Sequence, residues 1–165
     1  AARLVHWTMA ALILTMLGLG LAMVNSLAPW RTTGLWLHKL GGVLVLALVL
    51  LRIALRLACS PPPLPAHIGK VQQWIVSASH RLLYLLMVCA PLAGWAMQSA
   101  AGVPVILPGL VVLPSIAPES LQLYGLLRFL HGLTAWALLA LVALHVAAAL
   151  HHQWVRRDSL IQRMT

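Results

Sequence analysis

One stretch of the sequence, Phe129–Trp154, is apolar enough to cross a membrane and yet carries four histidines. Two of these, His131 and His145, are 14 residues apart. At 100° per residue, fourteen steps fall only about 40° short of four full helical turns, so both imidazoles share one face, roughly 21 Å apart along the axis. A histidine inside a membrane is costly without a partner, and the usual partner is a metal or a cofactor. The stretch therefore predicts a helix that presents two imidazoles to one interior, one near each membrane surface.

The composition places the whole chain in a membrane. The 165 residues are 62% hydrophobic and 8% charged, whereas a soluble domain of this size carries about 25% charged residues. The apolar runs are continuous rather than alternating, which excludes a transmembrane β-barrel. The net charge of +9 does not indicate nucleic acid, because the basic residues cluster at the ends of apolar segments as topology signals do. We expect an all-α membrane protein that forms a single domain over residues 1–165.

Four segments are long and apolar enough to span a bilayer, which takes about 20 residues. They are Leu4–Val24, Leu35–Leu57, Val76–Met97 and the histidine-bearing stretch, which begins near Leu121–Gly125. Arg52 and Arg56 end the second span and can snorkel to the interface. Pro91 inside the third is tolerated when neighbouring helices satisfy the freed carbonyl group. We expect a four-transmembrane-helix bundle, with a short polar loop over Asn25–Thr33 and a proline-containing loop over Ser99–Ser120 that packs on the membrane surface.

The distribution of basic residues predicts the orientation of this bundle. Four spans put both termini on one side of the membrane. That side holds eight basic residues: Arg3, Arg52, Arg56, Lys70, Arg81, Arg156, Arg157 and Arg163. The other side holds three: Arg31, Lys39 and Arg128. By the positive-inside rule, both termini are predicted to be cytoplasmic.

This topology gives each histidine a depth in the membrane. His38 and His131 fall near the outer face, and His6 and His145 near the inner face, so the four form one pair at each depth. Two imidazoles facing each other at one depth suit a six-coordinate haem iron. Three glycines beside these histidines leave room for a macrocycle to approach the backbone: Gly41, Gly42 and Gly132.

Other interpretations of the histidines remain open at this point. Any one of them could serve as an interhelical hydrogen-bonding residue. Zinc usually takes a third and fourth protein ligand, which the pairs lack. A proton pathway usually includes membrane carboxylates, and the only acids, Glu119 and Asp158, lie outside the spans. His152, seven residues past His145, competes for the inner site but lies at or beyond the edge of the hydrocarbon core.

Short motifs along essentially the whole chain resemble those of the bacterial cytochrome b561 family. In chain order they are Leu4-Val5-His6-Trp7, His38-Lys39-Leu40-Gly41-Gly42, Arg52-Ile53-Ala54-Leu55-Arg56 followed by Pro61-Pro62-Pro63, His80-Arg81-Leu82-Leu83-Tyr84, His131-Gly132, and Leu144-His145 leading to Ala149-Leu150-His151-His152. The resemblance implies a multi-pass di-haem b protein of the bacterial inner (plasma) membrane. The axial ligands of the haem irons that it implies are His6, His38, His131 and His145.

The resemblance also implies an activity. A member of this family is a superoxide oxidase, which passes electrons from superoxide to ubiquinone. The favoured hypothesis is therefore an enzyme that moves electrons from superoxide, or another outer-side donor, through two b haems to ubiquinone. The cytochrome b subunits of formate dehydrogenases and nickel–iron hydrogenases are similar, which gives the alternative of a membrane anchor that carries electrons between a partner dehydrogenase or hydrogenase and quinone. A histidine-rich transporter or sensor without haem is a third hypothesis.

Two further groups of residues are candidates for sites at the two ends of the bundle. On the outer side, Lys39, Arg31 and Arg128 could attract a small anionic donor such as superoxide, or they could hold haem propionates. On the inner side, His80 and His151 could contact quinone or deliver protons, since histidine titrates near neutral pH. Solvation at the interface is the competing explanation for this second group. His67 in the proline-rich loop receives no role.

Overall fold

The computed structural model describes residues 2–58, 69–109, 111–151 and 153–154. His67, His152 and the basic tail after Trp154 lie outside these residues, as does the proline-rich run after Ala58.

Four long helices make up most of the described chain: α1 (Ala2–Val24), α2 (Trp30–Ala58), α3 (Lys70–Ala100) and α4 (Leu121–His151). Each is long and apolar enough to cross a membrane, and at most 17% of the most apolar window of any of them is buried within the protein. The remaining apolar side chains face outward, where lipid can cover them. The prediction of a four-transmembrane-helix bundle is confirmed, while the orientation of its termini remains a prediction.

Two helices begin earlier than hydropathy predicts. Helix α2 starts at Trp30 rather than Leu35, and α3 starts at Lys70 rather than Val76. Pro29 precedes the first turn of α2, and the fixed φ of proline suits the start of a helix. The apolar run in the sequence marks the part of a helix that lies within the bilayer, and the helix itself can extend beyond it. The 31 residues of α3 span about 46 Å at 1.5 Å per residue, whereas the hydrocarbon core is about 30 Å thick.

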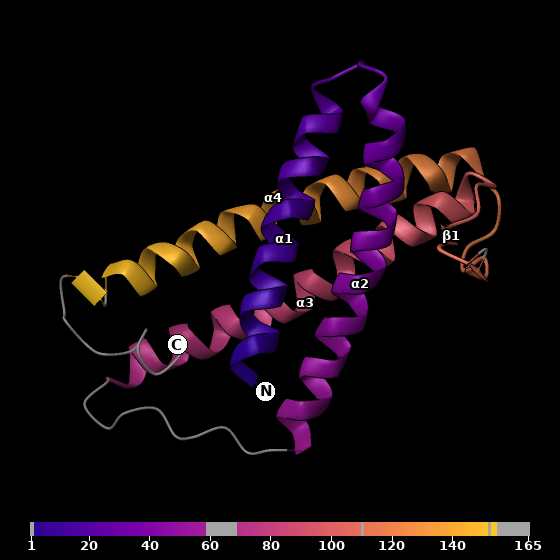
Figure 1. Cartoon of the computed structure of the whole chain (residues 1–165). Helices are drawn as coiled ribbons and strands as arrows, with labels where there is room; N and C mark the ends of the chain where they lie inside the picture. The colour runs from indigo at the N-terminus through magenta and orange to yellow at the C-terminus, as the bar shows by residue number, and fades with distance from the viewer. Residues whose placement is uncertain (1, 59–68, 110, 152, 155–165) are drawn as a thin grey trace.

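The helices form two hairpins that cross each other (Figure 1). Helices α1 and α2 make the first hairpin, α3 and α4 make the second, and α2 packs against α3 where the hairpins meet. Helix α3 continues through Pro91, as predicted. The loop between α1 and α2 and the loop between α3 and α4 lie at the same end of the bundle. Helices α1 and α3 therefore run in one direction, and α2 and α4 run in the opposite direction.

The segment between α3 and α4 contains a small hairpin. Strand β1 (Ile106–Leu107) pairs antiparallel with β2 (Val111–Val112), with Ile106 opposite Val112. Gly109 sits in the turn with a φ of 80°, a conformation that glycine adopts without strain. The indole nitrogen of Trp95 in α3 donates a hydrogen bond to the carbonyl of Pro114 at 3.1 Å, which ties the loop to the bundle. The loop is therefore a folded cap on this end of the bundle rather than a fifth span.

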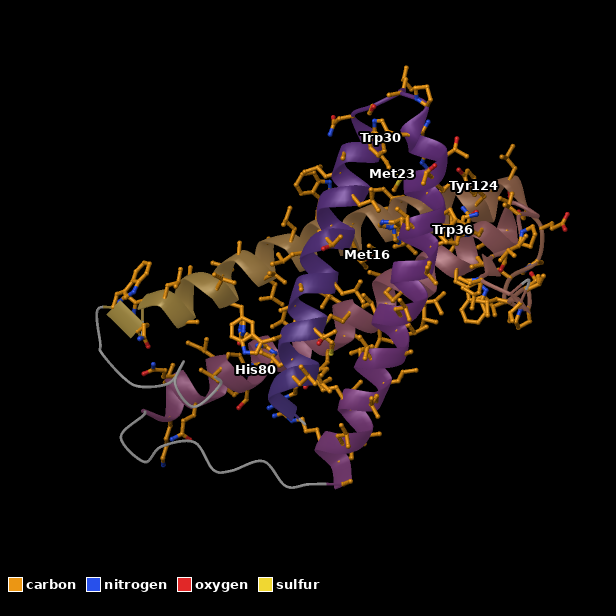
Figure 2. The ribbon with its side chains drawn as sticks, viewed as in Figure 1. Met16, Met23, Trp30, Trp36, His80 and Tyr124 are labelled. Atoms are coloured by element: carbon orange, nitrogen blue, oxygen red, sulfur yellow. The ribbon has the colours of Figure 1, made fainter. Side chains whose placement is uncertain are left out.

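Methionines and glycines interlock where α1 packs against α2. The side chain of Met16 occupies the space that a Cβ at Gly41 would need, and the sulfur of Met23 lies 3.3 Å from the Cβ position of Gly34. Figure 2 shows Met16 and Met23 between the two helices. Gly41 therefore serves the contact between helices, which corrects the expectation that it leaves room for a macrocycle. Gly42, the next residue, lines an internal cavity instead.

Candidate functional site

Each helix carries two inward positions that are fourteen residues apart in the sequence, and at least one position of each pair is a histidine. The pairs are His6 and Gly20 on α1, His38 and Arg52 on α2, His80 and Gly94 on α3, and His131 and His145 on α4. A buried apolar residue lies at the midpoint of each pair, seven residues from both of its members. These four residues are Ile13, Val45, Met87 and Leu138. Since alternate helices run in opposite senses, these positions form three layers. We name them the outer layer (Gly20, His38, Gly94, His131), the middle layer (the four apolar residues) and the inner layer (His6, Arg52, His80, His145), after the predicted topology.

The outer layer sets two imidazoles against two glycines. The ring centroids of His38 and His131 are 6.1 Å apart, with the ring planes 88° apart. A Cβ added at Gly20 would lie 3.3 Å from the His38 ring, and one added at Gly94 would lie 3.2 Å from the His131 ring. Real Cβ atoms seldom approach a neighbour so closely. Each glycine therefore makes room for a half-buried imidazole from the adjacent helix.

In each outer imidazole, the hydrogen bonding leaves one ring nitrogen that could bind a metal ion. His131 donates from Nδ1 to the carbonyl oxygen of Ala90 at 2.9 Å. A carbonyl can only accept, so in the neutral ring the lone pair is on Nε2, which is the form that binds a metal ion. A carbonyl bond at the other nitrogen is the usual way in which a protein orients a ligating histidine. Nδ1 of His38 is buried and has no hydrogen-bond partner among the described residues, and an orphaned buried nitrogen of this kind marks a missing partner.

A cavity of about 260 Å³ opens beside these two histidines. A single water molecule needs only about 10–15 Å³ on this measure, so the space suits a large group. Its floor is the middle layer, and its walls come from all four helices, together with buried Val105 from the loop. Lys39, Gly42 and Gly132 also line it. The lining is mostly apolar, with a few polar groups placed around it, which is typical of a cofactor site.

The inner layer is more polar than the outer layer. The ring centroids of His80 and His145 are 5.4 Å apart, and His6 lies close enough to interact electrostatically with both. His80 donates from Nδ1 to the carbonyl oxygen of Val76 at 2.8 Å, so the lone pair of its neutral ring is on Nε2. Figure 2 shows His80 on α3. The predicted partners His6 and His145 are thus brought near each other, but His80 is a third imidazole at the same depth.

An arginine completes the inner layer. Arg52 donates from Nε to the hydroxyl oxygen of Tyr84 at 2.9 Å. Tyr84 lies one turn beyond His80 on α3, and the guanidinium carbon of Arg56 lies 5.7 Å from the centroid of its ring, within the range of a cation–π contact. Sequence reasoning assigned both arginines to the membrane interface and missed the inward role of Arg52. The fourteen-residue interval between His38 and Arg52 is the signal that reveals it. The same interval also reveals Gly20 and Gly94.

The candidate residues outside the layers are dispersed. Arg31, in the first turn of α2, is exposed, and the guanidinium of Arg128 donates to the hydroxyl of Tyr124 at 3.3 Å. Only Lys39 of the three outer basic residues lines the cavity. At the other end, His151 is the exposed last residue of α4. Within the described chain no three His, Cys, Asp or Glu side chains are grouped as a metal site, so a three- or four-ligand zinc site finds no support there.

A helical bundle that could cross a membrane, with imidazoles of different helices paired in its interior, is typical of membrane proteins that hold a prosthetic group between histidines. Comparison with known proteins identifies the family. The chain belongs to the prokaryotic cytochrome b561 family, which it matches over residues 1–165. It is 28% identical over 162 residues to cytochrome b561 homolog 2 of Escherichia coli K12, covering 96% of this chain and 86% of that protein. It is also 28% identical over 140 residues to the probable superoxide oxidase CybB of Yersinia pestis, covering 85% of this chain and 77% of that protein.

Membership of this family implies b-type haem and a role in electron transfer, and the outer layer fits that group. Haem iron takes at most two axial side chains rather than the three or four protein ligands that zinc takes, so a pair of imidazoles is enough to hold it. Two imidazoles from different helices that face each other in the interior would hold such a group between them. The rings of His38 and His131 are 6.1 Å apart between centroids, the cavity adjoins both, and no cysteine follows the C-x-x-C-H pattern of covalent haem.

Proposed function

We propose that this protein is a di-haem b oxidoreductase of the bacterial inner membrane that carries electrons from an outer-side donor, superoxide in the favoured case, to ubiquinone. The observation that carries the proposal is the presence of histidines in two layers of one bundle, with α4 contributing one imidazole to each layer, fourteen residues apart. The similarity to a probable superoxide oxidase supports the choice of donor. In the balanced reaction, two superoxide anions each lose one electron and become dioxygen, and one quinone gains both electrons and two protons.

The proposed ligands are His38 and His131 in the outer layer and His6 and His145 in the inner layer. When bound, haem supplies one-electron redox chemistry, and the protein supplies ligation, orientation and electrostatics. The carbonyl of Ala90 orients His131, and Gly20 and Gly94 keep the space beside the outer imidazoles free. The middle layer contains no polar side chain, so it keeps water from joining the two histidine layers.

His80 and His151 are proposed to serve quinone at the inner end. Quinone reduction consumes protons, and a neutral histidine can take up a proton and pass it on near neutral pH. His80 suits this role because its Nδ1 is already held by the Val76 carbonyl, which leaves Nε2 to exchange a proton. His38 and His131 are the only histidines in the outer half of the described bundle, and both are proposed ligands, so no histidine there remains for proton supply.

A two-stage kinetic experiment tests this function. Stopped-flow absorbance follows haem reduction after superoxide is mixed with the purified protein, and then haem reoxidation after a ubiquinone analogue is added. In His80→Ala and His151→Ala we expect both haems to be retained and reduction to be unchanged, with slower reoxidation. Reoxidation of both variants at the wild-type rate would place the quinone site elsewhere. If the haem-loaded wild type ignores superoxide but accepts electrons from a partner dehydrogenase, the membrane-anchor alternative is correct.

A further inference from the structure

The inner and outer layers differ on three of the four helices. On α2, Arg52 stands in the inner layer and His38 in the outer layer, while α1 and α3 place His6 and His80 in the inner layer and glycines in the outer layer. Among the described residues, a guanidinium therefore stands in the inner layer and none stands in the outer layer. The cation nearest the outer histidines in sequence is Lys39, which lines the wall of the cavity rather than standing in the layer itself.

Tyr84 fixes this guanidinium in place. Its hydroxyl accepts the 2.9 Å hydrogen bond from Nε of Arg52. Because Tyr84 follows His80 by one helical turn, the bond holds the guanidinium next to the inner imidazoles. Arg52 consequently interacts electrostatically with His6, His80 and His145. A flexible arginine at the end of a span would otherwise extend toward water, as long basic side chains near helix ends usually do.

The positive charge of Arg52 has no acid to offset it within the spans. The chain contains only two acidic residues, Glu119 and Asp158. Glu119 lies in the loop at the opposite end of the bundle, and Asp158 follows the last helix in sequence. Inside a low-dielectric interior, a fixed charge acts more strongly on its neighbours than the same charge would in water. Arg56, over the ring of Tyr84, adds a second cation at the inner end.

We propose that Tyr84 is a positioning residue that fixes Arg52 in the inner layer, where its charge makes the inner redox centre easier to reduce than the outer one. This inference rests on the proposed function, because it requires a haem at each histidine layer. Reduction adds negative charge to a centre, so a fixed cation beside that centre stabilises the reduced form. The resulting difference directs electrons from the outer end toward the inner end, where quinone is proposed to be reduced.

Redox titration of the detergent-purified protein tests the inference, with haem content measured first. Tyr84→Phe removes only the hydroxyl and keeps the ring beneath Arg56, whereas Arg52→Gln removes the charge and Arg52→Lys keeps it. We expect Arg52→Gln to shift the reduction equilibrium of the inner centre about tenfold toward the oxidised form, which is about 59 mV for a one-electron couple. Tyr84→Phe should shift it in the same direction by a smaller factor, and Arg52→Lys should shift it least.

A matched control and a single-haem background make the outcome decisive. Arg81→Gln removes an exposed cation next to His80 in sequence and should leave the equilibrium within about twofold of wild type, because Arg81 lies on the outside of the bundle rather than in the inner layer. The His38→Ala background isolates the inner centre. The inference would be overturned if Tyr84→Phe and Arg52→Gln both retain two haems and both show unshifted reduction potentials. That conclusion would hold whether or not the variants lose thermal stability. A wild type without haem would instead refute the proposed function itself.

Discussion

At the scale of single residues, the role of a histidine as a ligand predicts a specific loss. Replacing His38 or His131 with alanine should remove the outer haem, and replacing His6 or His145 should remove the inner one, because haem iron with one axial imidazole is held more weakly. The pyridine haemochrome assay should fall from two haems per chain to about one in each variant. His151→Ala, a histidine of α4 outside the layers, should retain both.

The third imidazole of the inner layer makes one of these variants especially informative. Since the His80 ring lies 5.4 Å from that of His145, His80 could replace His6 as its partner. Retention of two haems in His6→Ala combined with loss of one in His80→Ala would reassign the inner pair. Unchanged haem content in His145→Ala would instead point to His152.

A glycine of the outer layer gives a second residue-scale prediction. In Gly94→Ala the new Cβ would lie 3.2 Å from the His131 ring, and the hydrogen bond to Ala90 limits how far that ring can move. We expect the crowding to cost about 1–3 kcal/mol and to lower occupancy of the outer haem, as measured by haem titration of the apoprotein. Gly18→Ala makes the same chemical change where nothing lies within 4 Å, and it should bind haem as wild type does. Equal haem binding in the two variants would contradict the proposed role of Gly94.

At the scale of elements, the contact between α1 and α2 can be tested by a double-mutant cycle. Gly41→Ala should destabilise the bundle by about 1 kcal/mol or more, because the added methyl group needs space that Met16 fills. Met16→Ala removes that obstacle, so the double variant should lose less stability than the two single losses combined. Thermal or denaturant unfolding in detergent, followed by circular dichroism, gives the four values. Strict additivity would show that the two residues do not interact.

The elements also show what a single sequence can and cannot predict. Hydropathy located all four helices, since lipid demands about twenty apolar residues at each crossing. It misplaced the starts of α2 and α3, because polar residues outside the lipid can still continue a helix. Gly20 and Gly41 look alike in the sequence, each in an apolar run that also carries a histidine. Which of them faces an imidazole and which faces Met16 depends on how α1 crosses α2, and that is decided by packing rather than by either helix alone.

At the scale of the whole molecule, the uneven distribution of charge bears on the donor. The end of the bundle predicted to face outward carries three basic residues, of which Lys39 alone lines the cavity beside His38. Electrostatic steering toward a cation at the mouth of a site can raise the on-rate of a small anion such as superoxide by roughly tenfold or more. Lys39 could equally hold a haem propionate, which would affect haem binding but not the salt dependence of reduction.

Substitution of Lys39 separates these two roles. If steering operates, Lys39→Gln should retain both haems and slow their reduction by superoxide severalfold at low ionic strength, because the cation nearest the cavity is lost. The difference from wild type should shrink near 1 M salt, where the screening length is about 3 Å. Arg81→Gln removes one exposed cation at the opposite end and is the matched control, with no expected change in the rate. Stopped-flow traces at several ionic strengths measure the effect. A reduction rate that responds neither to Lys39→Gln nor to salt would show that this end does not steer superoxide, whereas loss of the outer haem in Lys39→Gln would assign the lysine to haem binding.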